Sequence, residues 1–88
     1  MPPKRLPLPE IRAIARRICK DALDERRSSD PENMKRLMLD AIIHGRESVE
    51  CVFLIPAPKH VDGEVIARVY IHPLTGKLTD PPRASAQT

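Results

Sequence analysis

Three histidines and two cysteines are the nitrogen and sulfur side chains of this sequence that could bind zinc: His44, His60, His72, Cys19 and Cys51. A zinc site usually takes two ligands from one turn or one helix face, as in a Cys-x-x-Cys or His-x-x-x-His pair. Neither spacing occurs here. We therefore expect no metal and no other cofactor, with the histidines at the surface and the two thiols free and buried.

Catalytic motifs are equally sparse. The chain has three glycines, no Gly-x-Ser-x-Gly motif and no glycine-rich phosphate loop. His44 and Ser48 are four residues apart, but Gly45 lies between them at a predicted helix end, so a helical pairing is not expected. Thr75, Gly76 and Lys77 match the end of a phosphate loop without its strand–loop–helix context. The sequence predicts no catalytic residues and a protein that is not an enzyme.

Basic side chains gather on one flank of the helix predicted below for residues 9–27: Arg12, Arg16, Lys20 and Arg27. Acidic side chains are predicted on its other flank: Glu10, Asp21, Asp24 and Glu25. Like charges at i,i+4 cost an isolated helix a few tenths of a kcal/mol per pair, so something should compensate the repulsion. One interpretation is an anionic partner, either phosphates or an acidic protein surface. The other is a solvated face with partners in the same chain.

Two helices must position these residues. Pro9 suits the first turn of a helix to about Arg27, whose apolar residues recur at steps of three and four: Ile11, Ile14, Ala15, Ile18 and Ala22. Residues 28–30 then break the pattern and can cap a second helix that begins near Pro31. We expect this second helix to reach about His44, where Gly45 would supply a left-handed cap. Its apolar stripe would be Met34, Leu37, Met38, Ala41 and Ile42.

After Gly45 the apolar period changes to two, which is typical of strands. We expect strands at about 48–55, 64–72 and 77–79, joined by a loop over 56–63 and a tight turn at 73–76. On the first strand Val49, Cys51 and Phe53 alternate with Val52 and Leu54. The predicted fold is therefore a single α+β domain, with two N-terminal helices followed by a small antiparallel sheet in the order α-α-β-β-β.

This arrangement leaves apolar side chains without cover. Leu39 and Ile43 lie off the main stripe of the second helix, and four residues occupy the sheet face expected to point away from the helices: Val52, Leu54, Ile66 and Tyr70. A second copy or another protein would cover them. Alternatively, the helices and tails pack on opposite sides of the sheet and cover everything.

The 88 residues suffice for one domain, which we place at 9–79. We expect flexible tails on both sides of it: a proline-rich tail at 1–8 and a second tail at 80–88. Charged residues make up 31% of the chain and no apolar run could span a bilayer, so we expect a cytoplasmic protein that does not bind membranes. The net charge of +3 is concentrated toward the N-terminus. With only one phenylalanine and one tyrosine, the core must be thin, which favours oligomerisation or a stable complex.

These features predict a small non-catalytic protein-binding module: an inhibitor, adaptor or regulator, such as one from a mobile element, acting by occupancy as a homodimer or on another protein. The apolar patch would supply affinity, and basic residues at the helix flank and at Lys35 and Arg36 would supply register. The alternative is a nucleic-acid-binding protein with a reduced winged-helix-like arrangement. Its second helix would then enter the major groove, and a loop with Lys59 and His60 would contact the backbone.

Overall fold

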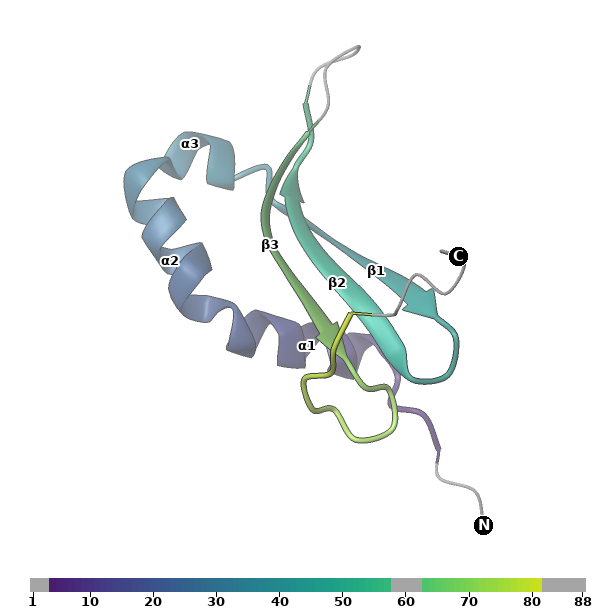
Figure 1. Ribbon diagram of the computed structural model, residues 1–88. Helices are drawn as coiled ribbons and strands as arrows, with labels where there is room; N and C mark the ends of the chain where they lie inside the picture. The colour runs from purple at the N-terminus through teal and green to yellow at the C-terminus, as the bar shows by residue number, and fades with distance from the viewer. Residues whose placement is uncertain (1–3, 58–62, 82–88) are drawn as a thin grey trace.

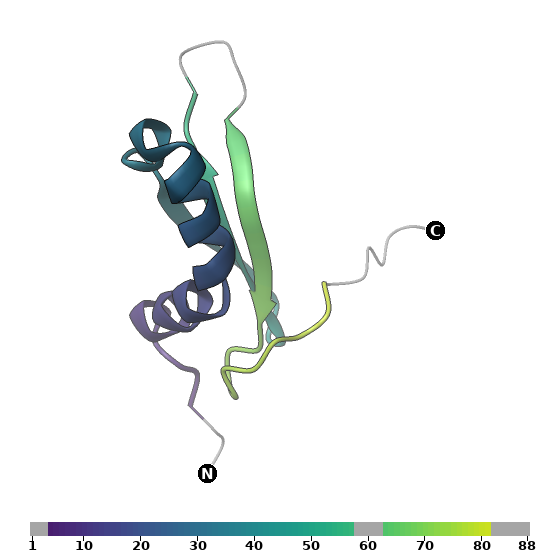
Figure 2. The ribbon, with the colours of Figure 1, turned by 90° about the vertical axis from the view of Figure 1, so that its left-hand side faces the viewer.

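The computed structural model describes residues 4–57 and 63–81. The helices are α1 (Leu8–Ile18), α2 (Lys20–Ser29) and the single turn α3 (Pro31–Met34), and the strands are β1 (Met38–His44), β2 (Ser48–Ile55) and β3 (Glu64–Ile71). The strands form one antiparallel sheet in the order β1-β2-β3, and the helices lie together on one side of it (Figures 1 and 2). The predicted α+β class, with two N-terminal helices before a three-stranded sheet, is confirmed.

The buried stripe of the first two helices holds them against the sheet. Ile11, Ala15, Cys19 and Leu23 follow one another at steps of four residues, and each is buried. The expected helix over 9–27 is therefore present, but it breaks at Cys19, whose backbone leaves helical geometry at φ −91° and ψ 6°. Because of this break α2 leaves the direction of α1 and runs along the sheet (Figure 1).

The predicted second helix to His44 is wrong. Helix α3 ends at Met34, and residues 38–44 form β1, which pairs with β2 from Met38 opposite Leu54 to His44 opposite Ser48. Apolar residues fall at both helical and strand spacings in this segment, so its pattern fits either structure. Pairing with the buried strand β2 decides in favour of the strand. Gly45 does have positive φ, +67°, but in a hairpin turn rather than a helix cap.

The strands predicted at 48–55 and 64–72 are present at Ser48–Ile55 and Glu64–Ile71. The strand predicted at 77–79 is reduced to one bridge between Leu78 and Ile71, so β1 takes the place of the third strand. Parts of the predicted tails, residues 1–3 and 82–88, and residues 58–62 of the predicted loop lie outside the described residues.

The core lies between the helices and one face of the sheet. Its strand residues are Val49, Cys51, Phe53, Ile55, Val69 and Ile71. The segment before α1 is bonded to the same end of the sheet as the β1–β2 turn, since the Leu6 N–H donates to the Pro73 carbonyl at 2.7 Å and Arg5 donates to the Gly45 carbonyl at 2.7 Å. The opposite sheet face faces the viewer in Figure 1, and none of the described helices covers it.

Candidate partner-binding surface

The sheet face that points away from the helices, called the open face below, is the strongest candidate site. Side chains alternate along a strand, so residues paired across strands share a face. Since Cys51 and Phe53 of β2 point into the core, their neighbours in β2 occupy the open face. The register then sets three rows across β1, β2 and β3: Met38–Leu54–Val65, Asp40–Val52–Arg68 and Ile42–Glu50–Tyr70.

The first row and Val52 form the apolar part of the open face. Met38 is 48% exposed and Val65 is 49% exposed, while Leu54 between them is half-buried. Val52 is only 6% exposed, because the side chains of the adjoining rows surround it. Large apolar side chains that remain accessible side by side on a sheet are typical of a contact surface for another protein.

Glu50, in the third row, is the middle of a polar centre that also includes His44, Arg68 and Tyr70. One Glu50 carboxylate oxygen lies 2.7 Å from His44 Nε2, and the other accepts a hydrogen bond from Arg68 Nε at 2.9 Å. The Tyr70 ring lies against the His44 ring, with centroids 6.4 Å apart. The Glu50 side chain is only 13% exposed, and these two contacts satisfy both of its oxygens within the sheet, as a buried carboxylate requires. This network holds the charged groups in fixed positions beside the apolar row.

Three of the predicted apolar contact residues, Val52, Leu54 and Tyr70, do lie on the open face. Ile66 does not, because a β-bulge in β3 opposite Phe53 and Leu54 turns it toward the core and turns Val65 outward. Had residues 38–44 been interpreted as a strand, Met38 would have been predicted on the face opposite to that of Leu39. The bulge that exposes Val65, by contrast, leaves no signal in the spacing of the apolar residues.

Leu39 and Ile43 were predicted to be uncovered residues of a helix, and both belong to β1 instead. Their side chains are on the face of the sheet that the helices pack against. Leu39 contacts the core, whereas Ile43 at the other end of the strand is 52% exposed. They therefore belong to the edge of the sheet and not to the open face.

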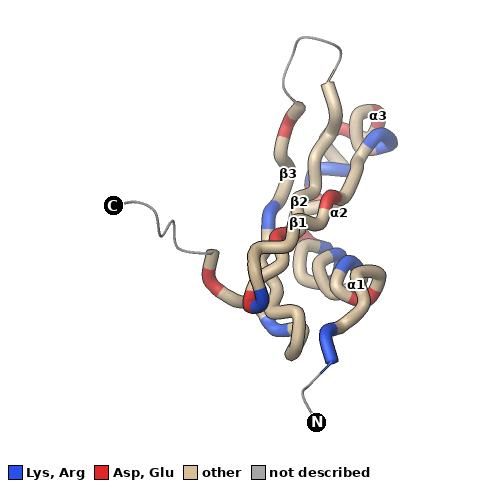
Figure 3. The backbone as a smooth tube through the Cα atoms, turned by 90° about the vertical axis from the view of Figure 1, so that its right-hand side faces the viewer, with Lys and Arg blue, Asp and Glu red and all other residues tan. Residues whose placement is uncertain are grey.

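The basic residues lie in the helix layer, on the other side of the sheet from the open face (Figures 2 and 3). Arg16, Lys20 and Arg27 surround a hollow of about 220 Å³ whose apolar lining includes Leu23 and Leu37. Arg12 and Arg16 line a second hollow, of about 450 Å³, along α1. The predicted basic flank thus exists, but it lies on the opposite side of the sheet from the open face and does not flank the apolar patch.

Asp24 lies among these basic residues, although the sequence predicted it on the other flank. It accepts hydrogen bonds from Lys20 at 2.6 Å and from Arg27 at 3.1 Å. The hydrogen bond from Lys20 lowers the pKa of Asp24 and raises that of Lys20. Within residues 4–57 and 63–81, Arg12 and Arg16 form no ion pair, and Arg12 Nε is buried without a hydrogen-bond partner. Of the four residues of the predicted basic flank, Arg12 and Arg16 are therefore the two whose charge is not paired among the described residues.

Lys35 and Arg36 lie after α3, away from the basic residues of α1. Lys35 pairs with Glu32 at 3.4 Å, and Arg36 donates to the Pro56 carbonyl at 2.9 Å. The Arg36 contact ties the end of the helix layer to the end of β2. These two residues therefore have contacts within the chain and do not extend the surface around Arg12 and Arg16.

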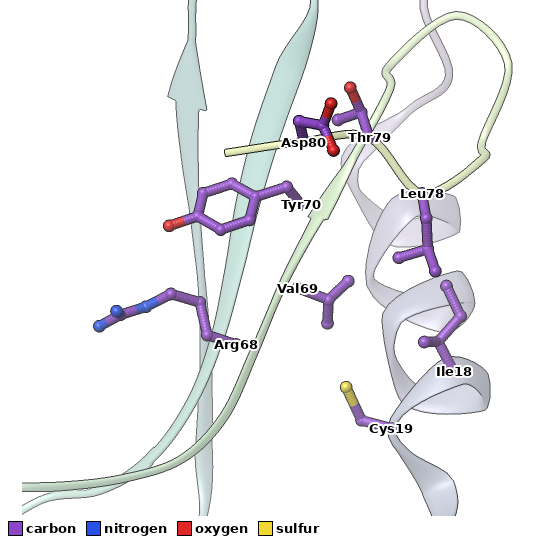
Figure 4. Close-up of a pocket in the computed structure, with 8 residues that line it drawn as sticks. All are labelled: Ile18, Cys19, Arg68, Val69, Tyr70, Leu78, Thr79 and Asp80. Atoms are coloured by element: carbon purple, nitrogen blue, oxygen red, sulfur yellow. The ribbon is translucent and has the colours of Figure 1, made fainter. Parts of the chain in front are cut away.

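A groove of about 680 Å³ follows the outer edge of β3. Figure 4 shows Ile18 and Leu78 on one side of it and Arg68 and Tyr70 on the other. Cys19, which also lines it, is a buried free thiol, and burial raises its pKa. A thiol of raised pKa holds its proton and is a poor nucleophile, so the groove has no activated cysteine.

Cys51 is likewise free and buried, as the sequence predicted for both thiols. Within the described parts of the chain, no three His, Cys, Asp or Glu side chains are grouped so that they could hold a metal ion. Among the helices of the described residues, none is long and apolar enough to cross a membrane. The chain matches no protein-family model, no curated protein and no solved structure.

Proposed function

We propose that this protein is a small non-catalytic protein-binding module that acts by occupancy, as an inhibitor, adaptor or regulator. The observation that carries the proposal is the one-sided architecture. All described helices pack on one face of the sheet, and the other face presents Met38, Leu54 and Val65 side by side. The predicted cytoplasmic location remains a prediction.

The open face combines the two properties that such a surface needs. Covering its apolar row would contribute about 25 cal/mol for each Å² of apolar surface removed from water. Asp40 lies toward the β1 edge and Arg68 toward the β3 edge of the same row, so the charge changes sign across the face. A partner of complementary charge would therefore bind in one orientation. The polar centre around Glu50 keeps Arg68 in place.

The test replaces Leu54 by lysine in the full chain, with Ile18→Lys as the matched control. Ile18 is 42% exposed in the helix layer, so its variant adds the same charge at an apolar position on the other side of the sheet. Affinity-tagged versions are isolated from the native host, and any retained protein is then purified and titrated against each version by calorimetry. We expect binding by the wild type and Ile18→Lys, a loss of at least tenfold in affinity for Leu54→Lys, and a negative heat-capacity change.

Circular dichroism must show that Leu54→Lys remains folded. A folded Leu54→Lys variant that binds the purified protein as tightly as the wild type would show that the open face is not the contact surface. An unfolded variant would show instead that Leu54 belongs to the core, and this result would also contradict the proposal.

A second candidate function is nucleic-acid binding, which the adjacent charges of Arg12 and Arg16 favour. The predicted winged-helix-like arrangement lacks its second helix, because residues 38–44 form β1, so binding would have to use α1. The affinity for a labelled duplex, measured by fluorescence anisotropy, should then fall steeply as the salt concentration rises. The double variant Arg12→Glu/Arg16→Glu should not bind the duplex. Salt-independent or undetectable binding would exclude this candidate.

A further inference from the structure

The outer edge of β1 carries main-chain groups with no bonding partner among the described residues. The His72 N–H donates to Lys77 and the Tyr70 carbonyl accepts from Thr79, so the even-numbered residues at this end of β3 direct their main chain outward. In antiparallel sheets this direction alternates along each strand. The strand register carries this alternation through β2 to β1, where Leu39, Ala41 and Ile43 direct their N–H and carbonyl groups away from β2.

The two edges of the sheet differ in their protection. The edge of β3 has a bulge at Ile66, charged residues at Glu64 and Arg68, and a cover formed by residues 77–79 at one end. Proteins commonly blunt exposed edges by these devices. The edge of β1 has seven regularly paired residues, no bulge and a single acidic residue, Asp40. Two isoleucines of β1 are also accessible, since Ile42 is 45% exposed and Ile43 is 52% exposed.

We propose that this edge is a homodimer interface, in which β1 of a second copy pairs antiparallel with β1 and joins two sheets into one of six strands. The strand is complementary to itself about Ala41. In that register Ala41 faces its own counterpart, and Leu39 faces Ile43 of the second copy at both ends. All these residues belong to the outward-directed set, so each opposed pair can exchange two main-chain hydrogen bonds.

Side chains favour the same register. Leu39 and Ile43 lie on the helix-facing side of β1, so pairing brings the exposed Ile43 against Leu39 of the other copy and continues the apolar core across the junction. Figure 3 looks onto this edge, with α1 beside it rather than in front of it. A two-fold pairing of identical edges also closes after two chains, whereas joining β1 to β3 would produce an open filament. The surface is distinct from the open face, so the inference goes beyond the proposed function.

The test uses proline at Ala41, with Ala41→Ser as the matched control. Proline removes the Ala41 N–H at the centre of the proposed pairing and places its ring in the path of the second strand. Bonds between β1 and β2 remain, because the Ala41 N–H points outward. By light scattering after size-exclusion chromatography, we expect twice the 9.9 kDa of one chain for the wild type and Ala41→Ser, and 9.9 kDa for Ala41→Pro.

Hydrogen exchange on the wild type supplies a test that does not depend on the folding of a variant. In the dimer, the amides of Leu39, Ala41 and Ile43 should exchange at least tenfold more slowly than at dilutions where the chain is monomeric, while Asp40 and Ile42 change little. A wild type that is monomeric at about 100 μM, or a dimer in which these three amides exchange freely, would overturn the proposal.

The open-face variant separates this inference from the proposed function. Leu54→Lys should leave the mass of the dimer unchanged, and Ala41→Pro should leave binding by the open face unchanged. A dimer that survives Ala41→Pro and dissociates with Leu54→Lys would show that copies associate through the open face, which would refute the edge pairing alone.

Discussion

Phe53 and Leu54 are neighbours in β2 that the structure assigns to opposite faces, so their alanine variants should differ sharply in stability. Phe53 is 1% exposed between the sheet and the helices, with Leu39 and Ala67 as its cross-strand neighbours. Truncating a buried phenylalanine to alanine costs about 3–5 kcal/mol. Leu54 is half-buried on the open face, where truncation removes only part of a contact and should cost about 1 kcal/mol.

The cost of about 3–5 kcal/mol for Phe53→Ala can be compared with the total stability of the chain. Single domains are stable by about 0.05–0.15 kcal/mol per residue, which for 88 residues is about 4–13 kcal/mol. Phe53 is the only phenylalanine, so little else can fill the space that it leaves. We therefore expect Phe53→Ala to be largely unfolded at the lower end of this range. Phe53→Leu, which keeps most of the apolar volume, should lose about 1–2 kcal/mol.

The assay is urea unfolding followed by circular dichroism at one fixed protein concentration, because a dimer's midpoint depends on concentration. With a slope of about 1–3 kcal/mol per molar urea, the loss for Phe53→Leu shifts the midpoint by about 0.3–2 M. Leu54→Ala should lower the urea midpoint much less than Phe53→Ala does. If Leu54→Ala is as destabilising as Phe53→Ala, the two faces of the sheet have been assigned the wrong way round.

Two further predictions concern the turns and the buried thiols. Gly45 and Gly76 both have positive φ, but a Cβ at Gly45 would meet open space, whereas one at Gly76 would lie 3.0 Å from Ile14 Cδ1. Replacement by alanine should therefore cost about 1–2 kcal/mol of stability at Gly45 and more at Gly76. Equal urea midpoints for the two alanine variants would contradict the packing of the turn at Gly76. Burial raises the pKa of Cys51 above 9.0, so the unfolded chain releases this proton at lower pH than the folded one. The free energy of unfolding should therefore fall as pH rises above about 9, and less so in Cys51→Ala; identical pH profiles would mean that the thiol is not buried.

Much of the fold could be predicted from the sequence, because several segments have only one reasonable interpretation. The apolar residues from Ile11 to Ala22 recur at helical spacing, and residues 48–55 alternate in a way that no amphipathic helix would. The same alternation placed Val52, Leu54 and Tyr70 on one face, where the structure also has them. These elements have the predicted type, although Ile18 and Ala22 of the predicted helical stripe are exposed.

The candidate site was predicted less completely, because two of its features depend on contacts between distant residues. The bulge at Ile66 exchanges the faces of Val65 and Ile66, and only the pairing of β3 with β2 reveals it. Met38 entered the open face only because residues 38–44 form a strand. The separation of the basic residues from the apolar face likewise follows from the placement of the helices on one side of the sheet.

By itself the sequence determined the helical N-terminal third, the strands expected at 48–55 and 64–72 and the α+β class, since each has a periodicity that one structure satisfies. The tertiary structure decided the segment 38–44, where helix and strand spacings are both present in the apolar residues. There the buried strand β2 needed a partner for the main-chain groups on its second side, and the chain after α3 supplied it. That choice also created the edge of β1 and the open face, the two surfaces on which the proposed interactions depend.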